Sequence, residues 1–289
     1  MTGFVEREWV SRDGLTLYAR DYAGGSGGCR LPVICLHGFT RNSKDFEEVA
    51  PRLATSGRRV LVPDIRGRGR SGSDPNPQNY QPRVYARDIL DLMDRLGMAR
   101  AVFVGTSMGG LITMALAAVR SRAVAAAVLN DVGPEVGRDG IERILAYAGK
   151  SSAIETWDDA TDYVRRTNGV AFPNYSESDW EGFARRTFRA EKGRPVLDYD
   201  PAIAAPHAGK PVRTRGLLAA LLFRRLARRR PTLLVRGELS DLTTVEIARR
   251  MKRSAPALQV AAIPRVGHAP ALTEPEAIAA IDEFLRAVP

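Results

Sequence analysis

Ser107 stands between two glycines in the run GTSMG at residues 105–109, which is the spacing of an exposed nucleophile. An apolar run precedes this turn and an Ala- and Leu-rich helical pattern follows it, so we expect a strand, a sharp turn and a helix. The small flanking residues let strand and helix approach each other closely. Helical N–H groups from Met108 onward would face an oxyanion formed beside the serine. The pattern predicts a nucleophile, although alone it also fits an ordinary helix-capping serine.

A nucleophilic serine needs a base, and the chain holds three histidines. His37 follows an early predicted strand directly beside a glycine, and His207 lies between predicted helices. His268 follows a late predicted strand in a Gly-His-Ala-Pro turn. Ligands of open parallel sheets bind beyond the carboxyl ends of the strands, where such a turn can hold an imidazole. We therefore expect His268 to be the base.

The base in turn needs a carboxylate to fix its tautomer. Asp241 ends the segment ELSD, one predicted strand before His268, and is our choice for this acid, with Glu238 close by. Asp131 ends another buried strand, and we interpret it as a turn residue that closes that strand. The order along the chain is then serine, aspartate, histidine.

Strands and helices alternate over most of the 289 residues, which predicts an α/β fold. We expect a mostly parallel eight-stranded sheet with helices on both faces, opened by an antiparallel hairpin around Asp13-Gly14. The alternation stops after the sixth strand. Residues 134–230 show no convincing buried strand but four helical patterns, so we expect a helical cap there and a core formed by 1–133 and 231–289. The four patterns cover residues 138–147, 157–166, 178–189 and 216–229.

These features together resemble the α/β-hydrolase superfamily along nearly the whole chain. The matching motifs are HGF at 37–39, PDIRGRGRSG at 63–72, GTSMGG at 105–110, RGELSD at 236–241 and VGHAP at 266–270. The resemblance implies Ser107 as nucleophile, His268 as base and Asp241 as the orienting acid. It implies an oxyanion hole made by the N–H groups of Phe39 and Met108. In some relatives the acid stands at the end of the sixth strand, the place of Asp131.

The superfamily resemblance further implies a capped serine hydrolase that cleaves carboxylic esters or lactones through an acyl-enzyme intermediate. A C–C hydrolase of aromatic ring-cleavage products is the alternative, although such relatives carry Gly-Pro-Gly where residues 39–41 read Phe-Thr-Arg. Dehalogenases and epoxide hydrolases need an aspartate in place of Ser107. A non-catalytic ligand-binding protein of the same fold is the third reading. Candidate substrate contacts are His37, Arg41, Tyr147 and Trp157, with Trp180 and Phe172 as further candidates for the pocket wall.

The net charge of +10 is concentrated, because residues 201–237 contain nine basic side chains and no acidic one. Within this segment, residues 216–229 predict an amphipathic helix with Leu218, Leu222 and Leu226 on one side and arginines on the other. We interpret the arginines as a solvated face and expect no nucleic-acid partner and no stable membrane association. The sequence carries no signal for an oligomeric state.

Composition and motifs also indicate which cofactors and which cellular compartment to expect. A composition of 44% hydrophobic and 26% charged residues is that of a globular protein. No metal-ligand spacing and no dinucleotide motif is present, so we expect chemistry without a cofactor or metal. Two cysteines, Cys29 and Cys35, are too few for a disulfide framework, and the N-terminus has no signal-peptide pattern. We expect a cytoplasmic protein acting on a small-molecule ester or lactone.

Overall fold

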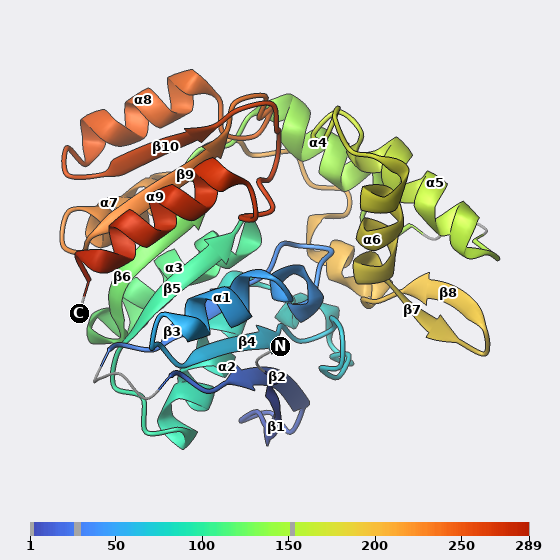
Figure 1. Cartoon of the computed structure of the whole chain (residues 1–289), viewed down its shortest axis with the longest axis horizontal. Helices are drawn as coiled ribbons and strands as arrows, with labels where there is room; N and C mark the ends of the chain where they lie inside the picture. The colour runs from blue at the N-terminus through green and yellow to red at the C-terminus, as the bar shows by residue number, and fades with distance from the viewer. Residues whose placement is uncertain (1–2, 26–29, 151–153, 289) are drawn as a thin grey trace.

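The computed structural model describes residues 3–25, 30–150 and 154–288, and an eight-stranded sheet lies at its centre (Figure 1). The strands lie in the order β1-β2-β4-β3-β5-β6-β9-β10, and all neighbours are parallel except at β1 and β2. The predicted fold class is therefore confirmed. The strand bounds are Val5–Val10 (β1), Thr16–Tyr22 (β2), Val33–Leu36 (β3), Val60–Asp64 (β4), Ala101–Thr106 (β5), Val124–Asn130 (β6), Thr232–Gly237 (β9) and Gln259–Ile263 (β10).

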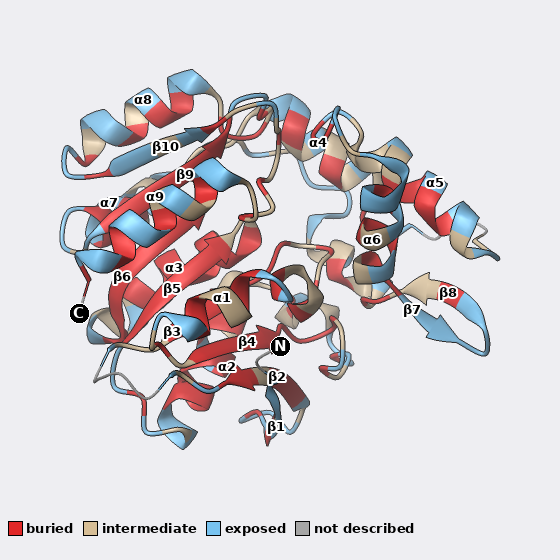
Figure 2. Cartoon of the chain, viewed as in Figure 1, coloured by how far each residue is buried: buried red, intermediate tan, exposed pale blue. Residues whose placement is uncertain are grey.

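Helices cover both faces of the sheet, as the apolar runs of its central strands require. Every residue of β3, β4, β6 and β9 is buried, as the red colour of the central strands in Figure 2 shows. One face carries α1 (Val49–Thr55) and α9 (Pro275–Arg286). The opposite face carries α2 (Pro82–Arg95), α3 (Met108–Val119), α7 (Leu217–Ala227) and α8 (Val245–Ser254). Short 3-10 turns span Ser43–Phe46 (η1), Pro77–Asn79 (η2), Ser121–Ala123 (η3) and Pro201–His207 (η4).

A cap follows β6 and stands over one end of the sheet, at the right of Figure 1. It has its own apolar centre of aromatic side chains, which includes Tyr163, Phe172, Trp180 and Phe183. Capping boxes at Thr156 and Ser176 begin two of its helices. A two-stranded hairpin that the sequence did not predict completes the cap. The elements are α4 (Arg138–Tyr147), α5 (Trp157–Asn168), α6 (Glu177–Thr187), β7 (Phe188–Glu191) and β8 (Arg194–Leu197).

Helix α7 differs from its prediction in two ways. It packs through Phe223, Leu226 and Ala227 on the main core cluster beside α3, so the cap ends before this helix and not at residue 230. Leu218 was expected on the buried side with Leu226, yet it is 68% exposed. The buried stripe is rotated because Phe223, the bulkiest apolar side chain of the helix, points into the core.

Two features that bear on the expected compartment are membrane-spanning helices and the cysteines. No helix in the described ranges is long and apolar enough to cross a membrane. Cys35 is buried within β3, and burial raises the pKa of its thiol. Cys29 lies outside the described residues.

Candidate active site

Ser107 occupies the sharp turn between β5 and α3, as predicted. Its backbone has φ 50° and ψ −111°, a strained conformation that a nucleophile-bearing turn adopts. The two glycines are required by space, not only by flexibility. A Cβ on Gly105 would lie 2.5 Å from the carbonyl carbon of Gly109, and a Cβ on Gly109 would lie 2.1 Å from the oxygen of Leu36. The strand and helix can therefore close on the serine only without these side chains.

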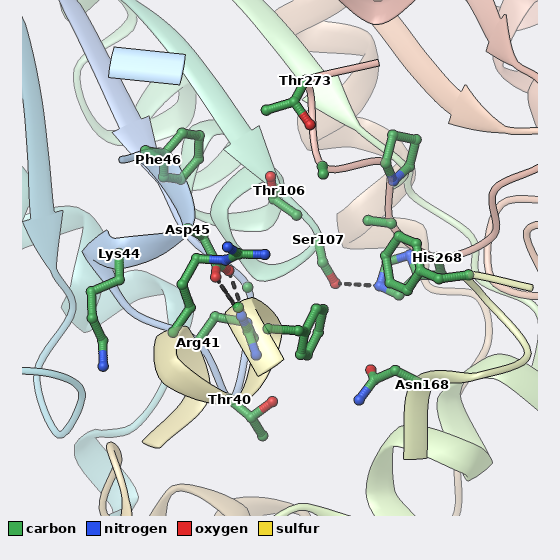
Figure 3. Close-up of a pocket in the computed structure, with 18 of the residues that line it drawn as sticks. Thr40, Arg41, Lys44, Asp45, Phe46, Thr106, Ser107, Asn168, His268 and Thr273 are labelled. Atoms are coloured by element: carbon green, nitrogen blue, oxygen red, sulfur yellow. Dashed lines mark hydrogen bonds and ion pairs between the residues drawn. The ribbon is translucent and has the colours of Figure 1, made fainter. Parts of the chain in front are cut away.

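His268 bonds Ser107 and a carboxylate at the same time. Its Nε2 lies 3.0 Å from Ser107 Oγ, and its Nδ1 lies 2.8 Å from Oδ2 of Asp131 (Figure 3 shows the Ser107 contact). A carboxylate only accepts, so Nδ1–H donates to Asp131 and Nε2 is left to accept the serine proton. The predicted contact between base and serine is therefore present, but the carboxylate is Asp131.

Asp131 is positioned by the end of β6 and by the loop after β9. Its φ of +55° turns the chain sharply after the strand, and its N–H donates to Val235 O at 2.7 Å. Its fully buried carboxylate accepts from the N–H of Gly237 at 3.2 Å and from the hydroxyl of Ser240 at 2.6 Å. These donors, with His268, stabilise a buried negative charge.

Asp241, the acid chosen from the sequence, does not fill that position. Its carboxylate forms a two-point ion pair with Arg143 of α4, with N–O distances of 2.8 and 2.9 Å. The sequence choice fails because the turn after β9 directs Ser240, the preceding residue, toward the Asp131 carboxylate. Asp241 then faces the cap, where it is partly exposed. The interpretation of Asp131 as only a turn residue is wrong in the same way, since it both closes the strand and bonds the base.

Asn130 ties the serine and histidine loops together. Its side-chain amide donates to Thr106 Oγ1 at 3.0 Å and to Pro270 O at 2.8 Å, while its backbone oxygen accepts from the Ser107 N–H at 2.9 Å. Neither Asn130 nor Ser240 was singled out from the sequence. The available signal was their place at the carboxyl edge of the sheet, where Asn130 ends β6 and Ser240 lies in the loop after β9.

The two residues expected to form an oxyanion hole both lie beside Ser107. Met108 is the first residue of α3, so its N–H has no acceptor within the helix. Phe39 and Gly38 line the same pocket as Ser107 and His268. The structure brings these groups together, and their role in binding an oxyanion stays a prediction.

His37 supports this turn from below and does not line the pocket. Its ring is fully buried, with Nδ1 2.8 Å from Gly38 O and Nε2 3.0 Å from the N of Ile65. The Ile65 N–H can only donate, so Nε2 accepts and Nδ1–H donates to the carbonyl. Burial lowers the pKa of His37 to about 4, which keeps the ring neutral. His37 is therefore a structural residue, contrary to the expectation of a substrate contact.

A pocket of about 440 Å³ opens above Ser107 between core and cap. Core residues from the loop after β3 form one side, and cap residues from α4, α5 and α6 form the other. Figure 3 labels Thr40 and Arg41 on the core side and Asn168 of α5 on the cap side. Arg41 lines it as expected, but Asp45 holds its guanidinium, which also lies 4.2 Å from the ring centre of Phe183. Burial lowers the pKa of Arg41, but the charge and hydrogen bonds of Asp45, together with nearby tyrosines, leave that pKa above its usual value.

The aromatic candidates of the cap divide into two groups. Tyr147 and Phe172 line the pocket. Trp180 is buried in the centre of the cap, and Trp157 stacks under the guanidinium of Arg185 at 3.8 Å on the cap surface. Trp157 is thus not a pocket residue, because it begins α5 and only the far end of that helix, at Asn168, lines the pocket. Within the described parts of the chain, no group of three His, Cys, Asp or Glu side chains is arranged to hold a metal ion.

Comparison with known proteins identifies the family of the chain. The model of the alpha/beta hydrolase family matches residues 33–281. The chain belongs to this family. A similar protein is the 3-hydroxybutyrate-oligomer hydrolase of Cupriavidus necator, which is 33% identical over 98% of this chain and 96% of its own. The chain is thus a hydrolase by family and by relatives.

Two further relatives cover essentially the full length. A crystal structure of an alpha/beta hydrolase from Novosphingobium aromaticivorans superposes with a TM-score of 0.90, at 43% identity over 100% of both chains. The 2-(acetamidomethylene)succinate hydrolase of Mesorhizobium japonicum is 29% identical over 98% of this chain and 96% of its own. These similarities extend through the cap, so the whole architecture is shared.

Proposed function

We propose that this chain is a serine hydrolase that cleaves carboxylic esters or lactones through an acyl-enzyme intermediate. The observation that carries the proposal is the unbroken line Asp131, His268, Ser107, which opens into the pocket between core and cap. Each contact has the distance and the polarity that proton transfer from the serine requires.

In the proposed reaction, Ser107 Oγ attacks the substrate carbonyl carbon while His268 Nε2 takes the hydroxyl proton. The resulting oxyanion accepts from the N–H groups of Phe39 and Met108. As the carbon–oxygen bond breaks, His268 gives its proton to the departing alkoxide. Water then attacks the acyl group, its proton passing to His268, and collapse releases the carboxylic acid and restores the serine. Asp131 stays ionised and stabilises the imidazolium.

For the substrate, we propose short esters of hydroxy acids as the first class to test. The relative from Cupriavidus necator bears the name of a hydrolase of 3-hydroxybutyrate oligomers and matches over nearly the full length. A cavity of about 440 Å³ lies in the range typical of small-ligand sites. A linear dimer of 3-hydroxybutyrate has one ester bond and is small enough for such a space.

The test uses purified enzyme with p-nitrophenyl butyrate, the linear 3-hydroxybutyrate dimer, a γ-lactone and a vinylogous C–C ring-cleavage substrate. We expect the wild type to turn over the first two substrates. The kcat of Ser107→Ala should fall at least 10³-fold. The control Ser73→Ala, which changes an exposed serine of another loop, should keep the wild-type kcat. A fluorophosphonate probe should label Ser107 in the wild type. Faster turnover of the C–C substrate would favour that rival, and an inert, unlabelled Ser107 would favour a ligand-binding protein.

A further inference from the structure

Two arginines of one loop are both buried, but only one of them is bonded to carboxylates. Arg66 and Arg68 lie between β4 and α2, and each is at most 1% exposed. Arg66 is neutralised by the carboxylates of Asp13, Asp74 and Asp88. The guanidinium of Arg68 bonds no carboxylate among the residues that the structure describes. A buried cation without a counter-ion is costly, and its retention calls for a physical reason.

The contacts of Arg68 reach both halves of the oxyanion turn. Its Nε donates to Phe39 O at 3.0 Å, and its Nη2 lies 3.6 Å from the sulfur of Met108. Phe39 follows β3 and Met108 follows β5, and β3 lies between β4 and β5 in the sheet. One side chain from the loop after β4 therefore spans the end of β3 to join residues from two separate loops.

The remaining contacts hold the guanidinium itself in one orientation. Its Nη1 donates to Arg66 O at 2.8 Å and to the hydroxyl of Tyr85 at 2.9 Å. The rings of Phe39, Tyr80 and Tyr85 surround its carbon at 5.2–5.5 Å between that carbon and the ring centres. Aromatic faces and carbonyl oxygens disperse the positive charge without cancelling it.

The charge of Arg68 affects the pKa values of nearby buried residues. Burial is the largest cause that lowers the pKa of His37 to about 4, and the positive charge of Arg68 adds to it. The same charge opposes the burial that raises the pKa of Tyr85. An oxyanion formed above Phe39 and Met108 would lie in this positive field, which a low-dielectric interior screens only weakly.

We propose that Arg68 is a positioning residue of the oxyanion hole, which fixes Phe39 and Met108 relative to each other and supplies an uncompensated positive charge beneath them. This inference rests on the proposed serine-hydrolase function. It assigns Arg68 to transition-state stabilisation and not to substrate binding. Its loss should therefore lower kcat and leave KM nearly unchanged.

The test compares R68Q, R68K and the matched control R70Q. Arg70 belongs to the same loop, but its guanidinium is half-exposed, pairs with Glu6 and covers the ring of Tyr18. With p-nitrophenyl butyrate we expect R68Q to lose about 100-fold in kcat, the effect of a misplaced catalytic donor. R68K keeps the charge but cannot bond Phe39 and Met108 together, so its kcat should fall about 10-fold. R70Q should match the wild type.

A second readout separates positioning from general damage to the fold. Phenylboronic acid forms a tetrahedral adduct on a serine nucleophile, and its Kd should rise in R68Q by the same factor by which kcat/KM falls. A folded R68Q with kcat and boronate affinity within twofold of wild type overturns the inference, and so does a loss confined to KM. If R68Q does not fold, the same measurements on R68K decide. Activity that survives Ser107→Ala would instead overturn the underlying function.

Discussion

The loops after β6 and β9 each place an aspartate at the carboxyl edge of the sheet, yet the two carboxylates differ in burial and in bonding partner. Asp131 is completely buried and bonds His268, whereas the side chain of Asp241 is 26% exposed and bonds Arg143 of the cap. The strands are neighbours in the sheet, so sequence position alone does not separate these sites. The difference lies in the local turn, because Asp131 adopts a φ of +55° that directs its carboxylate toward the histidine loop.

The largest expected effect follows from removing the buried carboxylate. In Asp131→Asn the amide still fits, but its NH₂ group opposes Nδ1–H of His268. The ring then adopts the other tautomer, with Nε2 protonated and unable to accept from Ser107. We expect kcat on p-nitrophenyl butyrate to fall about 10³- to 10⁴-fold while the far-ultraviolet circular dichroism is preserved. Activity within tenfold of the wild type would contradict the assignment of Asp131 as the orienting acid.

A smaller loss of kcat is expected from Ser240→Ala, which removes one hydrogen-bond donor from the Asp131 carboxylate. Ser240 Oγ donates to Asp131 at 2.6 Å and accepts from the N–H of Thr243 at 2.9 Å. A bond to a charged group contributes about 1.5 kcal/mol or more, which corresponds to roughly tenfold in kcat. Ser254→Ala, at the end of the following helix, is the control and should have wild-type kcat. Equal kcat in both variants would show that this hydroxyl does not support the acid.

Sequence reasoning predicted most of the fold because each strand and helix carries a local pattern. The apolar runs of β3, β6 and β9 and the glycine spacing around Ser107 each indicate their own secondary structure within a short stretch of sequence. The pairing of Ser107 with His268 also followed, since a chain with three histidines offers one on a late loop at the right edge. The cap hairpin β7-β8 was not predicted, because its two strands are only four residues long and do not form a continuous buried apolar run.

The position of the acid could not be read from local patterns. Both Asp131 and Asp241 follow buried strands, and their distances to His268 depend on how three loops turn after the strands have paired. The turn after β9 places Ser240, and not Asp241, against the Asp131 carboxylate. The partner of Asp241 is Arg143, which lies 98 residues away in the cap. No local sequence pattern predicts an ion pair between residues so far apart.

Asp241→Asn should affect catalysis far less than Asp131→Asn. The Asp241 carboxylate is not bonded to His268, and only the docking of α4 depends on it. Helix α4 contributes Ile144 and Tyr147 to the pocket, so a looser helix should raise KM about two- to threefold and leave kcat unchanged. Steady-state kinetics on both variants, measured side by side, check the contrast. A loss in kcat larger for Asp241→Asn than for Asp131→Asn would reverse the roles assigned to the two loops.

The smallest expected effect concerns the strength of the Arg143–Asp241 pair itself. Both side chains are about a quarter exposed, so water and salt screen their attraction. A double-mutant cycle of Arg143→Gln and Asp241→Asn should give a coupling of about 1 kcal/mol in the free energy of unfolding, near the upper end for such pairs because the contact is two-pronged. The coupling should shrink in about 1 M salt. A coupling that is absent at low salt would mean that apolar packing of α4, and not this ion pair, joins the cap to the loop after β9.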